Sequence, residues 1–91
     1  MRFIENVVIK KIAGTNVLLP IGQAMTEGII PVELSEEENY LVKVMIQGNA
    51  TVERLVEKIL VRYQVTVEEA RNMVDSFLSE CREFGYILED N

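Results

Sequence analysis

Apolar side chains recur with helical spacing over the last two thirds of the chain. Three segments carry an apolar stripe with the 3.6-residue period of an amphipathic helix, and each begins at a Ser or Thr that can cap a helix. In two of them a glutamate stands three residues after the cap, as in Ser35 with Glu38 and Thr66 with Glu69. This spacing is the capping box, in which each side chain satisfies a backbone N–H of the other residue. The pattern predicts three consecutive helices.

Caps and glycines set the limits of these helices. The first predicted helix runs from Ser35 to Gly48, the second begins at Thr51, and the third runs from Thr66 to Gly85. Only short linkers separate them, so they are expected to pack as one bundle.

The N-terminal third is rich in β-branched residues and predicts strands. Residues 7–13 (VVIKKIA) and 17–20 (VLLP) are strand candidates, and the turn signal Gly14-Thr15-Asn16 separates them. This arrangement predicts a β-hairpin.

A third strand is predicted over residues 29–34 (IIPVEL), after a glycine-bracketed loop at residues 21–28. Pro31 lacks an N–H, which confines this strand to a sheet edge or a bulge. Residues 86–88 (YIL) can form a further short strand or wing.

Together these elements predict an α+β fold in a single domain, residues 1–91. A three-stranded antiparallel N-terminal sheet, with strands at about residues 7–34, precedes a three-helix, winged helix-turn-helix-like bundle at about residues 36–84. A sheet this small needs a helical layer to cover its apolar face.

The aromatic edge of the third helix has two interpretations. Met73, Phe77 and Phe84 widen the apolar stripe on one side. They either pack in the core or form one wall of a groove for an apolar peptide, since Met and Phe adapt to varied partners.

Charge is unevenly distributed in a chain whose net charge is −6. Residues 1–34 carry three basic and three acidic residues, whereas residues 35–91 carry six basic and twelve acidic residues. The helical part therefore holds the whole negative charge and would repel a nucleic acid. We expect no nucleic-acid partner, although the scaffold alone also fits a winged-helix DNA-binding regulator.

Few side chains suit catalysis. The chain has no histidine and one cysteine, Cys81, so it has no imidazole base and cannot form an internal disulfide. Residues 36–38 and 68–69 are acidic and fall in the first turns of predicted helices, where they stabilise the positive end of the helix dipole. We expect no enzymatic activity, no cofactor and no metal site, and a buried, unreactive Cys81.

The expected location is the cytoplasm, without membrane contact. No run of 18 apolar residues is present, and charged residues interrupt the N-terminal apolar stretch where a signal peptide would need it unbroken. A lone cysteine suits a reducing compartment.

The chain from Leu34 to Leu88 resembles the PqqD-like proteins, the RiPP recognition elements (RiPP, ribosomally synthesised and post-translationally modified peptide). The segments that carry the resemblance are VELSEEENYLVKVM, IQGNATVERLVEKILVRYQV and TVEEARNMVDSFLSECREFGYIL, and VLLP upstream resembles a family strand. Its most specific element is the spaced set Gly48, Thr51-Val52-Glu53, Phe77-Leu78 and Gly85-Tyr86-Ile87.

The resemblance implies a non-enzymatic protein that binds the leader segment of a precursor peptide. The leader would add as a strand beside the third strand, pack against the third helix, and be presented to a modifying enzyme such as a radical-SAM or cyclodehydratase-type maturase. The residues that the resemblance assigns to the strand edge are Ile29, Ile30, Val32 and Glu33. Those that it assigns to the helix side are Val67, Arg71, Val74 and Phe77 or their neighbours, and Met73 of the aromatic edge is included with them.

Pro31 leaves a question about the proposed docking strand. If its missing N–H position faces outward, the leader loses a hydrogen bond; if it faces inward, the sheet does. Pro31 would also limit indiscriminate pairing at this edge, where the chain could otherwise pair with its own copy as a homodimer. A structural subunit of another protein complex is the remaining alternative.

Overall fold

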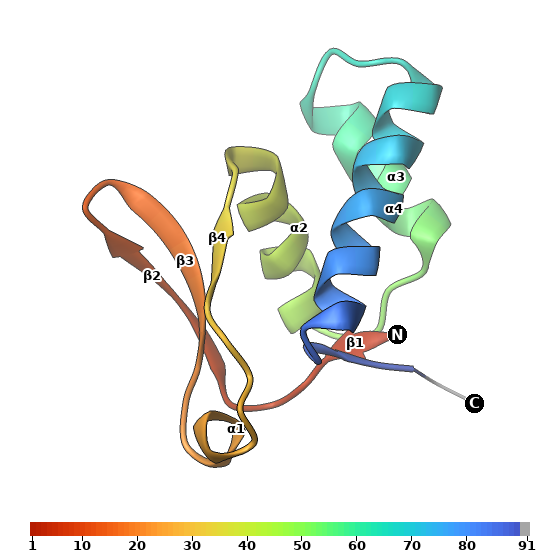
Figure 1. The fold of residues 1–91 in the computed structure, drawn as a ribbon. Helices are drawn as coiled ribbons and strands as arrows, with labels where there is room; N and C mark the ends of the chain where they lie inside the picture. The colour runs from red at the N-terminus through yellow and green to blue at the C-terminus, as the bar shows by residue number, and fades with distance from the viewer. Residues whose placement is uncertain (90–91) are drawn as a thin grey trace.

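The computed structural model describes residues 1–89. A three-stranded sheet precedes three long helices, and a second, two-stranded sheet joins the N-terminal segment to the C-terminal one (Figure 1). This arrangement confirms the predicted α+β fold. In chain order the elements are β1 (Arg2–Phe3), β2 (Val7–Ile12), β3 (Thr15–Pro20), α1 (Gln23–Thr26), β4 (Val32–Leu34), α2 (Glu36–Ile46), α3 (Val52–Arg62), α4 (Val67–Glu83) and β5 (Ile87–Leu88).

β2 and β3 form the predicted hairpin, but its turn lies earlier than expected. The antiparallel register pairs Ile12 with Thr15, so the turn consists of Ala13 and Gly14 alone. Both have positive φ, 51° and 82°, as required by the two-residue turn that matches the twist of the strands. The prediction that Thr15 and Asn16 belong to the turn was wrong, because Gly14 supplies its second position and both residues pair in β3.

The segment between β3 and β4 also differs from the prediction. The expected loop at residues 21–28 contains the short helix α1, and β4 begins three residues later than expected, at Val32. Continuing the β3–β4 register would set Ile30 opposite Pro20. Since Pro20 has no N–H to donate, the ladder stops at the pair of Leu18 with Val32.

All three predicted helix caps are present. The Ser35 hydroxyl accepts from the Glu38 N–H at 3.2 Å, and the Glu38 carboxylate accepts from the Ser35 N–H at 2.7 Å. Thr66 and Glu69 form the same reciprocal pair at 3.0 Å, and Thr51 caps α3. The bond from the Thr66 backbone, followed by that from its side chain, lowers the pKa of Glu69.

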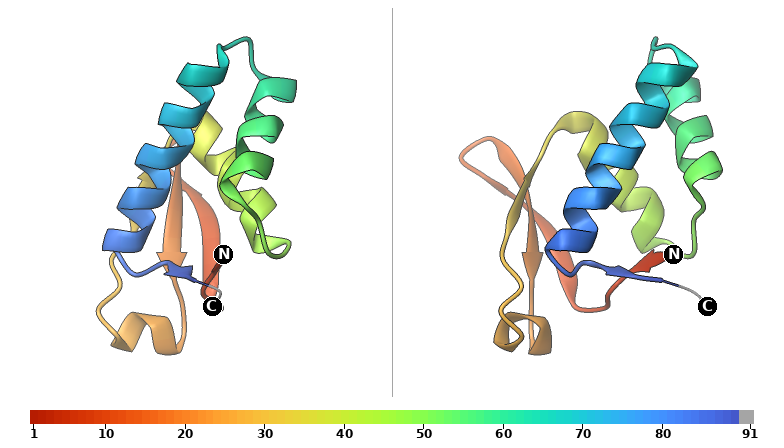
Figure 2. Two further views of the ribbon diagram at one scale, coloured as in Figure 1. Left: turned by 90° about the vertical axis from the view of Figure 1, so that its right-hand side faces the viewer. Right: turned by 45° about the vertical axis from the view of Figure 1, so that its right-hand side comes forward.

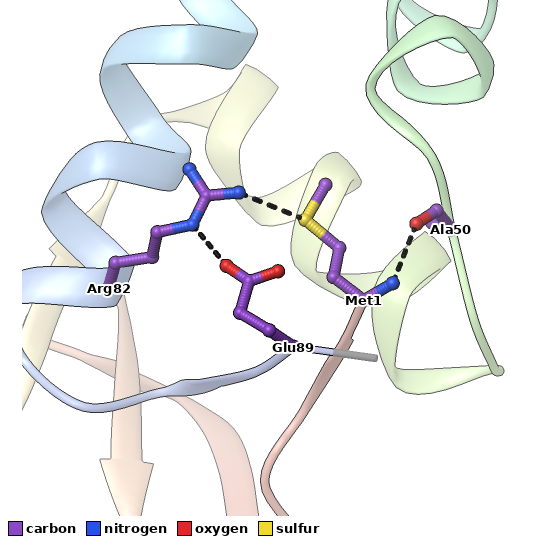
Figure 3. A network of polar contacts seen from close by, with 4 residues as sticks. All are labelled: Met1, Ala50, Arg82 and Glu89. Carbon is purple, nitrogen blue, oxygen red and sulfur yellow. Dashed lines mark hydrogen bonds and ion pairs between the residues drawn. The ribbon is translucent and has the colours of Figure 1, made fainter. Parts of the chain in front are cut away.

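The two terminal segments are held together beside α3 and α4. β5 confirms the predicted C-terminal strand, and it pairs antiparallel with β1, which was not predicted. The N-terminal amino group donates to the Ala50 carbonyl at 3.2 Å, just before α3 (Figure 3). Arg82 of α4 forms an ion pair with Glu89 and contacts the Met1 sulfur at 3.6 Å.

The hydrophobic core lies between the inner face of the three-stranded sheet and the helices. Leu18, Val32 and Leu34 contribute from the sheet, and all three are at most 5% exposed. Figure 2 shows α3 and the three-stranded sheet on different sides of α4. From the helices the core takes Leu41, Val42, Met45, Leu55, Val56, Ile59, Ala70, Val74, Phe77, Leu78 and Cys81.

Candidate functional site

β4 is an edge strand of the three-stranded sheet, because the strand order is β2-β3-β4. The Ile21 N–H donates to the Asn6 carbonyl at 2.8 Å, which continues the β2–β3 ladder beyond Pro20. Counting back from Ile21 in steps of two, Leu19 and Val17 direct their backbone groups toward β2. By alternation Leu18 faces β4, where it pairs with Val32. Glu33, the next residue, therefore directs its backbone N–H and carbonyl outward, away from the sheet.

Few hydrogen-bond donors are free along this outer edge. Pro31 has the same outward orientation as Glu33 in the register and has no N–H. Ser35 also faces outward, but its N–H is bonded to the Glu38 carboxylate. Between residues 31 and 35 the outer edge thus offers one donor to an added strand, the Glu33 N–H. Because Pro31 faces outward, its missing N–H removes a hydrogen bond to the added strand and none within the sheet.

Tyr86 fixes the chain just before β4. Its side chain is fully buried, and its hydroxyl donates to the Ile30 carbonyl at 2.6 Å. The Leu18 carbonyl is a second, more distant acceptor, 3.4 Å from the same hydroxyl. The shorter bond replaces the one that Pro20 cannot make to Ile30. Burial, and to a smaller extent the neighbouring Cys81, raises the pKa of Tyr86 to about 12, so the hydroxyl remains a donor at neutral pH.

One flank of α4 faces the N-terminal segment and the start of α3. Arg71 and Arg82 are eleven residues apart, which is about three helical turns, and therefore share this flank. The contacts of Arg82 with Met1 and Glu89 show which way it points (Figure 3). Arg71, which the resemblance assigned to the peptide site, is thus on the flank turned away from β4.

The opposite flank of α4 faces the three-stranded sheet and is apolar with an acidic margin. Met73 and Phe84, again eleven residues apart, lie there half-buried, with the half-buried Glu80 beside them. At the end of this flank Gly85 lies against Ile29: a Cβ built on Gly85 would be 3.8 Å from Ile29 Cγ1. We call the outer edge of β4 together with this flank the β4–α4 surface. Its exposed or half-buried residues are Pro31, Glu33, Met73, Glu80 and Phe84.

The structure places the residues assigned by the resemblance in three different environments. Glu33 and Met73 lie on the β4–α4 surface, and Ile30, 53% exposed, lies just before β4. A second group is buried in the core or packed against it and shapes the surface from beneath. This second group is Ile29, Val32, Val74 and Phe77.

The third group lies away from β4 and contains the exposed Arg71 and Val67, the latter in the first turn of α4. The resemblance did not assign Phe84 or Tyr86 to the peptide site. The apolar pattern of the third predicted helix had named Phe84 with Met73 as part of a groove wall, whereas nothing in the sequence indicated the bond from Tyr86 to residue 30.

The polar chemistry near this surface is acidic and not nucleophilic. The Cys81 thiol is fully buried, as predicted, and burial raises its pKa to about 12, with the Glu80 and Glu38 carboxylates adding to the shift. Residues 1–89 contain no group of three or more His, Cys, Asp or Glu side chains that could hold a metal ion. Over the same residues, no helix has the length and hydropathy needed to cross a bilayer. The β4–α4 surface can offer backbone hydrogen bonds, apolar contacts and negative charge.

Comparisons with known proteins identify the fold and the family. The chain resembles a solved structure described as lasso peptide synthetase B1 complexed with the leader peptide, with a TM-score of 0.69 and 15% sequence identity over 97% of this chain and 96% of that one. No curated protein sequence matches the chain. A family model described as coenzyme PQQ synthesis protein D (PqqD) matches residues 40–87, which is more than half of the chain. The protein therefore belongs to the PqqD family, as its sequence motifs indicated.

Proposed function

We propose that this protein binds the leader segment of a ribosomally made precursor peptide and presents it to a modifying enzyme, without catalysing a reaction itself. The observation that carries the proposal is the free outer edge of β4 beside the apolar flank of α4. The leader adds as a strand to this edge, and alternate side chains contact Met73 and Phe84. Membership of the PqqD family and the fold shared with a leader-bound lasso peptide synthetase protein support this assignment.

The edge geometry determines how the binding energy is divided. The leader exchanges backbone hydrogen bonds with Glu33, each with a net value of about 0.5–1.5 kcal/mol. A micromolar complex requires about 8 kcal/mol, so backbone pairing at Glu33 supplies the smaller part. The larger part comes from apolar leader side chains buried against the flank of α4, after the cost of ordering the leader.

The acidic margin favours a leader with a basic residue. Glu33 is exposed on β4, and the carboxylates of Glu38 and Glu80 are near enough to Cys81 to affect its titration. A Lys or Arg of the leader next to its apolar anchor would pair with this margin. The modifying enzyme, of the radical-SAM or cyclodehydratase type, would act on the rest of the precursor.

An NMR titration with the leader of a small peptide encoded beside this gene tests the proposal. We expect amide shifts at β4 and along the sheet-facing flank of α4. The variant Glu33→Pro removes the outward donor without removing a sheet hydrogen bond, and should weaken binding about 3- to 10-fold.

Two variants control for proline and for charge. Lys11→Pro places a proline at an outward position of β2, the opposite edge strand, and should bind the leader normally. Glu33→Gln keeps the N–H and removes the charge. Equal weakening by Lys11→Pro and Glu33→Pro, or no binding of the leader by the unaltered protein, would refute strand addition at β4.

A further inference from the structure

Four of the six basic residues in the helical part gather on one side of α2 and α3. Lys43 lies on α2, and Arg54, Lys58 and Arg62 lie on α3 at spacings of four residues, which places them on one face of that helix. They line adjoining cavities between the two helices, the largest of about 510 Å³. We call this region the α2–α3 groove.

The charge of the groove is opposite to that of its surroundings. Its lining contains four basic residues and two acidic ones, Glu36 and Glu57, which gives a net charge of +2. The whole chain has −6, so the rest of the chain carries −8. Within residues 1–89, none of the four basic side chains forms an ion pair. Uncompensated cations in such a field are available to an external anionic group.

Aromatic and apolar groups stand among these cations. The Arg62 guanidinium lies 4.5 Å from the centre of the Tyr40 ring and 5.9 Å from that of Tyr63. The two rings meet edge to face, 6.3 Å apart, which holds the guanidinium in place from one side. Val61, on the same face of α3, is 88% exposed.

We propose that the α2–α3 groove is a second binding surface, which docks an acidic segment of a partner protein. A segment with Asp or Glu beside an apolar or aromatic residue would meet the four cations and also cover Val61 and Tyr40. A nucleic acid would face −8 on the remainder of the chain, and a free phosphate would leave Val61 uncovered. The proposal does not depend on leader binding.

The groove and the β4–α4 surface are built on separate residues. The groove uses α2 and α3, whereas the leader surface uses β4 and the flank of α4 that is turned toward the sheet. The two ligands can therefore bind at the same time.

A titration of the full chain with a synthetic ten-residue peptide tests this proposal. The probe contains glutamate at every position except one central phenylalanine, and a matched peptide has glutamine in place of glutamate. We expect amide shifts at residues 40, 43, 54, 58 and 62 with the glutamate peptide and none with the glutamine peptide.

Variants then assign the binding to these side chains. Lys58→Gln combined with Arg62→Gln should weaken the glutamate peptide at least about tenfold. Lys10→Gln combined with Lys11→Gln removes two exposed cations on the hairpin and should change nothing, and circular dichroism checks that both variants are folded.

Four results would overturn the proposal. They are the absence of shifts, shifts confined to the β4–α4 surface, equal affinity for inorganic phosphate alone, and tighter binding of a ten-nucleotide single strand than of the peptide.

Discussion

The β4–α4 surface and the α2–α3 groove differ in how they can recognise a ligand. The first offers a strand edge with one free donor, an apolar helix flank and an acidic margin. The second offers four unpaired cations around an aromatic pair. Backbone pairing tolerates many leader sequences, whereas clustered charge selects by sign. A chain of 91 residues thus carries two surfaces, one suited to backbone and apolar contacts and one that selects by charge.

The largest effect is expected at Tyr86, which holds the chain before β4 and does not line the α2–α3 groove. Tyr86→Ala should lower the free energy of unfolding by about 3–5 kcal/mol, because it empties a fully buried aromatic site. Tyr86→Phe keeps the ring and leaves the Ile30 carbonyl without its donor, at a cost of about 1–3 kcal/mol.

Denaturant unfolding measures these changes. Leader affinity of Tyr86→Phe should fall with them, while binding of the glutamate peptide at the α2–α3 groove stays the same. A Tyr86→Phe protein of unchanged stability would show that the bond to residue 30 has no role in holding β4.

Salt should separate the two surfaces. Raising the ionic strength from 0.1 M to 1 M shortens the Debye length from about 10 Å to about 3 Å and should weaken the glutamate peptide by about tenfold or more. The leader, held mainly by apolar contacts and backbone bonds, should lose less affinity. Isothermal titration at both salt concentrations gives the change in affinity with salt for each ligand. Equal changes would show that the two surfaces do not differ in their dependence on charge.

Cys81 reports on the acidic character of the β4–α4 surface. Its pKa of about 12 arises first from burial and then from Glu80 and Glu38, so Glu38→Gln combined with Glu80→Gln should lower it while leaving it above the usual thiol value. The rate of thiol alkylation as a function of pH measures this shift. An unchanged profile would place those carboxylates too far away to influence a ligand.

The same thiol makes stability depend on alkaline pH. In the unfolded chain a cysteine ionises near pH 8.5, whereas in the folded protein it ionises near pH 12. The folded-state pKa is the higher one, so the contribution is complete below about pH 8.5 and is lost as the pH rises toward 12. Urea unfolding at a series of pH values measures this contribution. The free energy of unfolding of Cys81→Ala should fall less than that of the unaltered protein as the pH rises above about 8.5.

The smallest effect is expected at the start of α4, where Thr66 lines neither surface. Thr66→Ala removes the cap and should cost about 1 kcal/mol of unfolding free energy, without changing either affinity. Since hydrogen bonds lower the pKa of Glu69 in the folded state, its contribution is present above pH of about 4.3 and is lost below it. Thermal unfolding at pH 3 and pH 7 should therefore show a smaller effect of Thr66→Ala at pH 3.

The helices were predictable because their signals are local. The boxes at Ser35 and Thr66 depend on two side chains three residues apart, and both form as expected. The strands were harder, because their limits depend on partners distant in sequence. The late start of β4 results from Pro20, which lies across the sheet from Ile30, and β1 exists because it pairs with β5.

The candidate site was partly predictable for the same reason. Helical periodicity identified Met73 as part of an aromatic edge, and the acidic balance of residues 35–91 was visible from composition. The sequence did not show that Arg71 lies on the flank turned away from β4, because Arg82 and the chain terminus fix that orientation. Nor did it show that four of the six basic residues of the helical part gather between α2 and α3.

Hydrogen exchange at the Glu33 amide, with and without the leader, tests strand addition most directly. This N–H faces outward and has no partner in the sheet, so it should exchange quickly in the free protein and become protected when the leader binds. The amide of Leu34, which faces β3, serves as an internal reference that is protected in both states. Leader binding that leaves the Glu33 amide exchanging at its free rate would contradict strand addition at β4.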